Sequence, residues 1–156
     1  MDELKKKVEK LLKNVKKEKI ISKKPKIKKP RTSKCSWVEV GGKKFYARSS
    51  WEANYGRYLQ WLKDRGEILD WEHEPQRFTF DKIKRGNNSY LPDFKVYKTD
   101  GSHEWHETKG FNDSVSKTKI KRFKFYYPEE KLVLIDSTIY NQIKNNLSRM
   151  IPGWGS

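Results

Sequence analysis

Hydrophobic residues recur at helical spacing in two early segments of the chain. Between Asp2 and Lys19, lysine occupies nearly every other position, so a helix there is expected to be marginal unless it binds to something. Between Ser49 and Gly66 the apolar stripe contains Trp, Tyr and Leu and is bounded by a serine cap and a glycine stop. We therefore predict a helix in this second segment, with its aromatic stripe packed in the core.

Stretches that favour strands fill much of the chain between residues 37 and 109. The stretch "WVEVGGKKFYA" has two such segments about Gly41-Gly42 and predicts a hairpin. Three further strands, expected to pair antiparallel, are predicted at residues 68–80, 90–97 and 103–109.

The pattern becomes helical again at Ser114, with Val115, Ile120 and Phe123 predicted to face inward. The continuous apolar run "KLVLID" that follows is typical of a strand covered on both faces, and a last amphipathic helix completes the pattern. The order helix, three strands, helix, strand, helix predicts an α/β fold in which a small mixed sheet is flanked by helices.

Positive charge is concentrated at the start of the chain, which carries +16 overall. Residues 1–34 contain 15 Lys and Arg against 4 Asp and Glu, and they account for +11 of that charge. Pro25 and Pro30 interrupt any helix in this segment. We predict that residues 1–34 form a basic helical or disordered arm and that residues 35–156 form one folded domain.

A segment with this charge density attracts polyanions, so nucleic acid is the predicted partner. An anionic membrane surface is a weaker alternative, because the first helix has no aromatic anchor and only a narrow apolar stripe. The longest purely aliphatic run is "LVLI", which indicates neither secretion nor membrane spanning. With Cys35 as the single cysteine, no disulfide is expected, and a cytoplasmic location is predicted. This would be the host cytoplasm for a phage protein, and a nuclear location is the alternative in a eukaryote.

Three polar residues near the predicted strands are candidates for catalysis: Asp93, Glu107 and Lys109. Alternation along a strand puts Glu107 and Lys109 on one face, and antiparallel pairing would bring Asp93 beside Glu107. Clustered carboxylates repel each other unless a cation shares the site, and Mg²⁺ prefers one or two carboxylates plus water and phosphate oxygens. The pattern predicts a phosphoryl-transfer site in which Lys109 orients the attacking water or stabilises charge on the phosphate.

These motifs resemble those of a known nuclease superfamily. Asp93 in "YLPDF" and Glu107-Thr108-Lys109 in "HETKG" resemble the PD-(D/E)XK motif. Together with Glu52 in "RSSWE", they are similar to the motifs of the phage endonuclease I family of Holliday-junction resolvases. By this resemblance, Asp93 and Glu107 are catalytic metal ligands, Lys109 is the catalytic lysine, Glu52 is an additional acid that binds metal, and the Thr108 carbonyl is a further ligand.

A "G-x-x-F" hairpin before the aromatic helix, from Gly42 to Phe45, resembles small phage nucleases more closely still. The resemblance spans residues 41–136 and implies a restriction-endonuclease-like core. It also implies Mg²⁺ as the cofactor, with Mn²⁺ as a substitute, and cleavage of DNA that leaves 5′-phosphate and 3′-hydroxyl ends.

Several substrates and roles stay open at this point. A nuclease that cuts branched DNA such as a Holliday junction needs two active sites and is therefore expected to be a homodimer. The alternative nuclease cuts or nicks a specific duplex site, as restriction, transposon-end and homing enzymes do. Two non-catalytic alternatives are a nucleic-acid-binding module and an accessory protein that docks on a partner through its first helix.

The candidate acids also have simpler explanations. Ser49 and Glu52 satisfy the spacing of a capping box, in which the acid bonds the backbone of its own helix cap. Glu107 and Lys109 could form a surface ion pair, and Asp93 could shape a turn.

Other polar residues of the region are predicted to be secondary. His73 and His103 are predicted to be surface residues, and His106 faces away from Glu107. Glu72, Glu74 and Gln76 alternate onto one face of their predicted strand, where any of them could assist the site.

Nucleic-acid contacts are expected from basic residues of the arm, of the segment before the aromatic helix and of the helix after Ser114: Lys23, Lys24, Lys26, Lys28, Lys29, Arg31, Arg48, Lys117, Lys119, Lys121 and Arg122. For the last four, a plain solvated helix face is the alternative.

Overall fold

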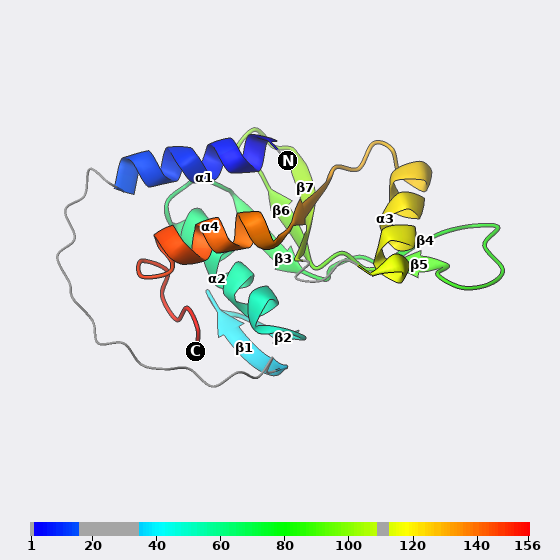
Figure 1. Cartoon of the computed structure of the whole chain (residues 1–156), viewed down its shortest axis with the longest axis horizontal. Helices are drawn as coiled ribbons and strands as arrows, with labels where there is room; N and C mark the ends of the chain where they lie inside the picture. The colour runs from blue at the N-terminus through cyan, green and yellow to red at the C-terminus, as the bar shows by residue number, and fades with distance from the viewer. Residues whose placement is uncertain (1, 16–34, 109–112) are drawn as a thin grey trace.

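A four-stranded mixed sheet forms the centre of the protein (Figure 1). Its strand order is β3 (Asp70–His73), β6 (Phe94–Tyr97), β7 (His103–Thr108) and β8 (Leu132–Ile135). The first three strands pair antiparallel, as predicted, and β8 runs parallel to β7. The computed structural model describes residues 2–15, 35–108 and 113–156, and within these the chain is a mixed α/β protein as predicted.

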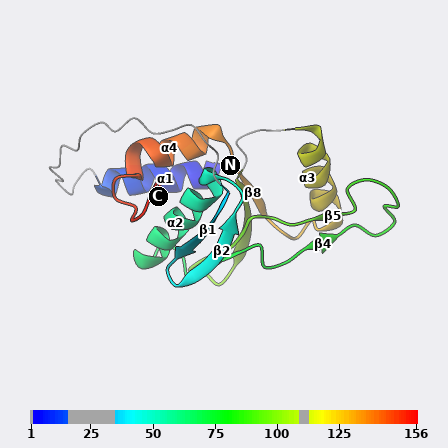
Figure 2. The same ribbon diagram turned by 90° about the horizontal axis from the view of Figure 1, so that it is seen from below.

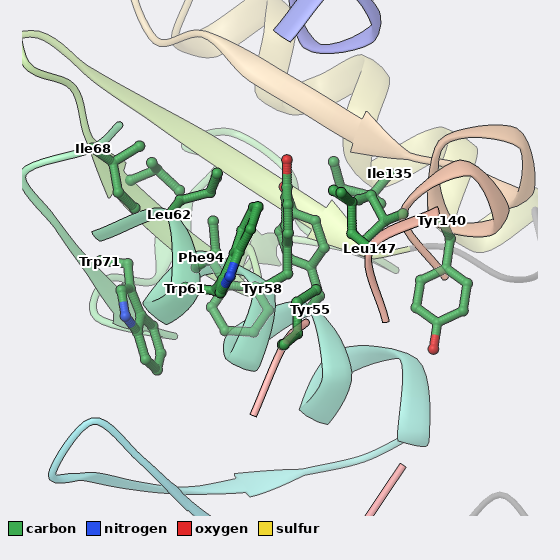
Figure 3. Packing of buried hydrophobic residues seen from close by; sticks show 14 of the residues in the cluster. Tyr55, Tyr58, Trp61, Leu62, Ile68, Trp71, Phe94, Ile135, Tyr140 and Leu147 are labelled. Atoms are coloured by element: carbon green, nitrogen blue, oxygen red, sulfur yellow. The ribbon is translucent and has the colours of Figure 1, made fainter. Parts of the chain in front are cut away.

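Three helices cover one face of this sheet: α1 (Asp2–Val15), α2 (Ser50–Asp64) and α4 (Ser137–Leu147). Helix α2 starts where the Ser49 side chain accepts a hydrogen bond from the Glu52 N–H, which satisfies one of the free donors of the first turn. Its predicted aromatic stripe is confirmed, because Tyr55, Tyr58 and Leu59 are completely buried (Figure 3). This stripe forms the main core together with the sheet and α4.

A separate layer contacts the opposite face of the sheet at Trp105. It consists of α3 (Ser114–Tyr126) and a small two-stranded sheet of β4 (Phe78–Thr79) and β5 (Ser89–Tyr90). Buried aromatic side chains of these elements pack on Trp105 of β7 in a second core cluster. In both views the layer projects to one side of the main body (Figures 1 and 2).

The predicted hairpin is confirmed as β1 (Ser36–Val40) and β2 (Lys43–Ala47), joined at Gly41 and Gly42. Both glycines have positive φ, of 57° and 77°, as a tight hairpin turn requires. The inner face of the hairpin packs on α2, where Phe45 lies against the backbone of Gly56. A Cβ at Gly56 would come within 2.8 Å of the Phe45 ring, so glycine permits this close approach.

Two of the predicted strands are wrong in extent, because each is broken in the middle. The segment predicted at 68–80 ends as β3 at His73 and resumes as β4, with Glu74 at a positive φ of 44° and Pro75 between them. The segment predicted at 90–97 is divided by Pro92 into β5 and β6. Proline has no N–H to donate to a ladder, so each break moves the chain from one sheet to the other.

Helix α3 also differs from its predicted orientation at one position. Phe123 is fully buried as expected, but Val115 is 51% exposed. Only the C-terminal part of α3 packs against the aromatic residues of β4 and β5, whereas Val115 lies in its first turn.

Helix α1 packs on the domain rather than standing apart from it. Leu4, Val8 and Leu11 are buried in the main core, and the Lys7 ammonium donates to the Glu67 carbonyl over 3.0 Å. This tertiary packing stabilises a helix that would be marginal in isolation. Residues 16–34 lie outside the described residues, so the predicted boundary at residue 34 stays a prediction. None of the described helices is both long and apolar enough to cross a membrane.

Replacing Leu11 with alanine tests the packing of α1. Leu11 is 1% exposed, and removing a buried leucine side chain leaves a cavity, so we expect the unfolding free energy to fall by about 2 to 4 kcal/mol. Chemical denaturation of the full chain measures this change, with the exposed Lys6→Ala on the same helix as the control. Equal stability of both variants and the wild type would mean that α1 is not part of the cooperative core.

Candidate active site

A cleft of about 280 Å³ lies between the central sheet and the layer formed by α3, β4 and β5. Asp93 and Glu107 both line it, so the two acids that the sequence analysis singled out share one cavity. Its remaining lining residues come from β2's end, β4–β5 and α3: Arg48, Arg77, Tyr90, Leu91, Ser116, Lys119 and Ile120.

The pairing of β6 with β7 brings Asp93 and Glu107 together. Phe94 pairs with His106, so the same antiparallel register continued by one residue sets Asp93 opposite Glu107. The Asp93 Oδ2 accepts two hydrogen bonds from Thr108, from the backbone N–H over 2.8 Å and from Oγ1 over 2.7 Å. Asp93 is thus fixed to the end of β7, directly beside Glu107. Whether the Thr108 carbonyl binds metal stays a prediction.

Glu107 is held by a residue that the sequence analysis did not select. The Tyr90 hydroxyl donates to Glu107 Oε2 over 2.8 Å, and burial together with this carboxylate raises the pKa of Tyr90 well above its usual value. Tyr90 therefore stays a hydrogen-bond donor at any physiological pH. The one feature of the sequence that could have indicated a role for Tyr90 is its position in "YLPDF", three residues before Asp93.

Glu52 makes contacts on two sides, and its predicted role as a metal ligand stays a prediction. Its backbone N–H bonds the Ser49 side chain, as in a capping box, but its Oε2 accepts from the N–H of Arg48 rather than from that of Ser49. Its Oε1 points the other way and lies 2.5 Å from His73 Nε2. One carboxylate oxygen caps the helix and the other faces the sheet.

His73 and Glu74 join Glu52 in a compact cluster. Potential ligand atoms of these three residues lie within 4.8 Å of one another, and theirs is the one such group among the described residues. The prediction that His73 is a surface residue is wrong: its side chain is 9% exposed and stacks on Phe45. The prediction that Glu74 shares a face with Glu72 is also wrong. Strand β3 ends before Glu74, whose positive φ turns its side chain toward His73.

The cluster perturbs Asp93. Burial raises the pKa of Asp93 to about 6, the nearby carboxylates of Glu52 and Glu74 add to the increase, and the bonds from Thr108 oppose it. Asp93 is thus repelled by the carboxylates of Glu52 and Glu74, although the chain as a whole is strongly basic. A bound cation would relieve this repulsion.

The donor set fits a divalent cation. Carboxylate oxygens are the ligands that Mg²⁺ and Mn²⁺ prefer, and the His73 imidazole adds a nitrogen that favours transition metals. Glu52 is the one residue that the predicted set of metal ligands shares with the observed cluster. The predicted ligand Glu107 instead accepts a hydrogen bond from Tyr90, and the cluster is completed by His73 and Glu74.

Basic side chains form the rim of the cleft. Arg48 makes an ion pair with Glu74, with 2.5 Å between Nη1 and Oε1, while its side chain remains 60% exposed. Lys119 of α3 and Arg77, which the sequence analysis did not select, complete this rim. A phosphate backbone passing over the acids would meet these three cations.

The other predicted nucleic-acid contacts of α3 are dispersed. Lys117 and Lys121 are exposed and do not line the cleft, and the Arg122 guanidinium donates to the Asn87 carbonyl over 2.5 Å. Lys109 and the basic residues of the arm lie outside the described residues: Lys23, Lys24, Lys26, Lys28, Lys29 and Arg31.

His106 lies on the opposite side of the sheet from Glu107, as predicted. It is buried between Tyr55, whose hydroxyl is 2.7 Å from Nδ1, and Glu104, which is 3.1 Å from Nε2. Burial lowers the pKa of His106, and the contacts fasten α2 to β7. His106 therefore supports the fold behind the site.

The fold and the site together define a mixed α/β protein in which two acids, Asp93 and Glu107, share a cleft with basic side chains. Residues 28–142 match the family model described as protein of unknown function DUF1064. The match covers more than half of the chain and includes all the acids of the cleft, so the chain belongs to this family. No curated protein matches it.

The electrostatic repulsion at Asp93 predicts a pH-dependent stability. Because the folded-state pKa is about 6 and the unfolded value is 3.8, ionisation is harder in the folded protein, and stability falls as pH rises between these values. Asp93→Asn, which retains an oxygen for the bonds from Thr108, should stabilise the protein in EDTA at pH 7.5 by on the order of 1 to 3 kcal/mol. Thermal unfolding measured against pH checks this prediction. The gain should shrink below pH 6 and vanish near pH 4, and a gain independent of pH would contradict the assigned cause.

Proposed function

We propose that the protein is a metal-dependent DNA endonuclease that hydrolyses phosphodiester bonds. The observation that carries the proposal is that Asp93 and Glu107 line one cleft together with Arg and Lys side chains, while the Glu52 carboxylate lies close enough to raise the pKa of Asp93. Asp93, whose pKa is raised by burial and by nearby carboxylates, lies beside Glu107 in a cleft with basic side chains, and this combination suits a divalent cation and a phosphate together.

Each side chain of the cleft has a role in this proposal. Asp93 and Glu107 would hold Mg²⁺, or Mn²⁺ in its place, and hydrogen bonds from Thr108 and Tyr90 fix the orientation of the two carboxylates. Arg48 and Lys119 bind phosphate oxygens of the DNA. Glu52, His73 and Glu74 form the second group of ligand atoms on the side of the sheet that faces α2.

The reaction is the addition of water across a P–O bond. A cation held by these acids would supply electrophilic stabilisation of the phosphate and would lower the pKa of the nucleophilic water. Water attacks phosphorus in line with the bond to the 3′ oxygen, and that bond breaks. The 3′ oxygen leaves with a proton as a hydroxyl and the phosphate stays on the 5′ end, as the resemblance to PD-(D/E)XK nucleases implies. Lys109, the predicted catalytic lysine, stabilises the charge that develops on the phosphate.

The order of elements supports a restriction-endonuclease-like core. Helix α2, the antiparallel strands β3, β6 and β7, helix α3 and the parallel strand β8 follow the succession that the resemblance implies. The small β4–β5 sheet, inserted between β3 and β6, forms one wall of the cleft. Because β4 and β5 form a wall of the cleft, we propose that this inserted sheet contributes to the choice of DNA substrate.

Cleavage of DNA in Mg²⁺ tests the proposal. We expect Glu107→Gln to lower the rate at least about 100-fold, because it removes an anionic ligand without changing shape. Lys109→Ala should lower the rate by a similar factor, because it removes charge stabilisation in the transition state. Both variants should still bind DNA. Labelled duplex, nicked duplex and four-way junction are the substrates, and EDTA should abolish cleavage.

Glu72→Gln is the matched control. Glu72 lies on β3, next in sequence to His73 of the cluster, but alternation along the strand turns its side chain the other way. Its carboxylate accepts a hydrogen bond from the Tyr97 hydroxyl over 2.6 Å, and glutamine keeps that bond. This variant should cut at the wild-type rate. Binding without cleavage by wild type and variants alike would sink the nuclease and favour a non-catalytic binding module.

A further inference from the structure

The outer face of the β1–β2 hairpin exposes two aromatic rings that the core does not use. Trp37 is 66% exposed and Tyr46 is 44% exposed, whereas alternate residues of both strands are buried against α2. The two rings belong to directly paired residues and meet edge to face, with their centroids 5.6 Å apart. The fold of the hairpin is therefore maintained by its inner face, and the outer aromatic pair is available to a ligand.

The aromatic pair is continuous with the rim of the candidate active site. Arg48 follows Tyr46 by two residues, one position beyond the end of β2, so the two residues are within about 7 Å of each other along the chain. Arg48 itself lines the cleft. A nucleotide adjacent to a phosphate held by Arg48 would reach Tyr46 and Trp37.

The charge on this face suits nucleic acid. The Lys44 ammonium lies 5.6 Å from the centre of the Trp37 ring, and Arg48 provides a second cation. The one acid of the outer face, Glu39, pairs across the hairpin with Lys44. Cations interleaved with exposed aromatic rings are the combination that binds single-stranded nucleic acid through phosphates and base faces.

We propose that this outer face is a stacking surface for unpaired bases of the DNA substrate. A perfect duplex hides its base faces within the helix, so the aromatic pair favours DNA with single-stranded nucleotides next to the cleavage point, such as a fork or a flap. The proposal rests on the proposed function for the position of the scissile phosphate. It narrows the substrate class toward branched DNA with unpaired nucleotides.

Binding measurements on the full chain test the stacking surface. Fluorescence anisotropy in EDTA and about 200 mM salt, which weakens the sequence-independent contacts of the basic arm, compares a single strand, a splayed fork and a duplex of one sequence. We expect the double variant Trp37→Ala/Tyr46→Ala to bind the single strand and the fork about 10- to 100-fold more weakly, because alanine offers no ring on which a base can stack. Binding to the duplex should change less than about 2-fold.

Two further variants separate stacking from damage to the fold. Trp37→Phe, made in the wild-type chain, keeps an aromatic ring at this position and should retain most of the wild-type affinity for the single strand. Leu69→Ala removes an equally exposed hydrophobic side chain (56% exposed) at the start of β3, away from the cleft, and should bind as the wild type does.

The outcomes are distinguishable from those of the cleavage assay, because no metal and no hydrolysis are needed. Unchanged single-strand affinity in the double variant, or an equal loss on duplex, overturns the stacking surface even where Glu107→Gln abolishes cleavage. Selective loss on the single strand upholds the surface even where no DNA is cut.

Discussion

The pair of hydrogen bonds from Thr108 to Asp93 is the interaction on which the candidate site depends. The bonds tie the start of β6 to the end of β7, immediately beyond the last pair of their ladder, Phe94 with His106. They hold a carboxylate in a buried position next to Glu107, where repulsion would otherwise move it toward water. Both strands are fixed further along by the aromatic residues packed on their two faces, so the acids cannot separate without disturbing both core clusters.

The sequence specifies the framework of this site well. The capped aromatic helix, the glycine hairpin and the antiparallel β6–β7 pair have local signals, namely caps, turn glycines and alternation, which follow from backbone geometry. The proximity of Asp93 to Glu107 was predictable because antiparallel pairing leaves few registers that bury Phe94 and Trp105.

Other parts of the site depend on interactions that the local pattern does not record. The backbone of Glu74 is left-handed, although this position is not a glycine, so the sequence gives no sign of it. This conformation places the Glu74 carboxylate near His73 rather than on the face of Glu72. The layer of α3, β4 and β5 arises because two predicted strands are broken near prolines and change sheets. The docking of α1 likewise depends on an apolar surface assembled from α2, α4 and the sheet, which are distant in the chain.

The glycine at position 56 has a mechanical consequence for the cleft. Glycine within a helix costs about 1 kcal/mol relative to alanine, but here it lets the Phe45 ring rest on the helix backbone with no side chain between them. The hairpin and α2 therefore pack as one rigid unit. Arg48 follows the hairpin and Glu52 lies in the first turn of α2, so the two residues are close together in the chain. An added methyl group at this contact would push the hairpin and α2 apart and change the spacing between Arg48 and Glu52.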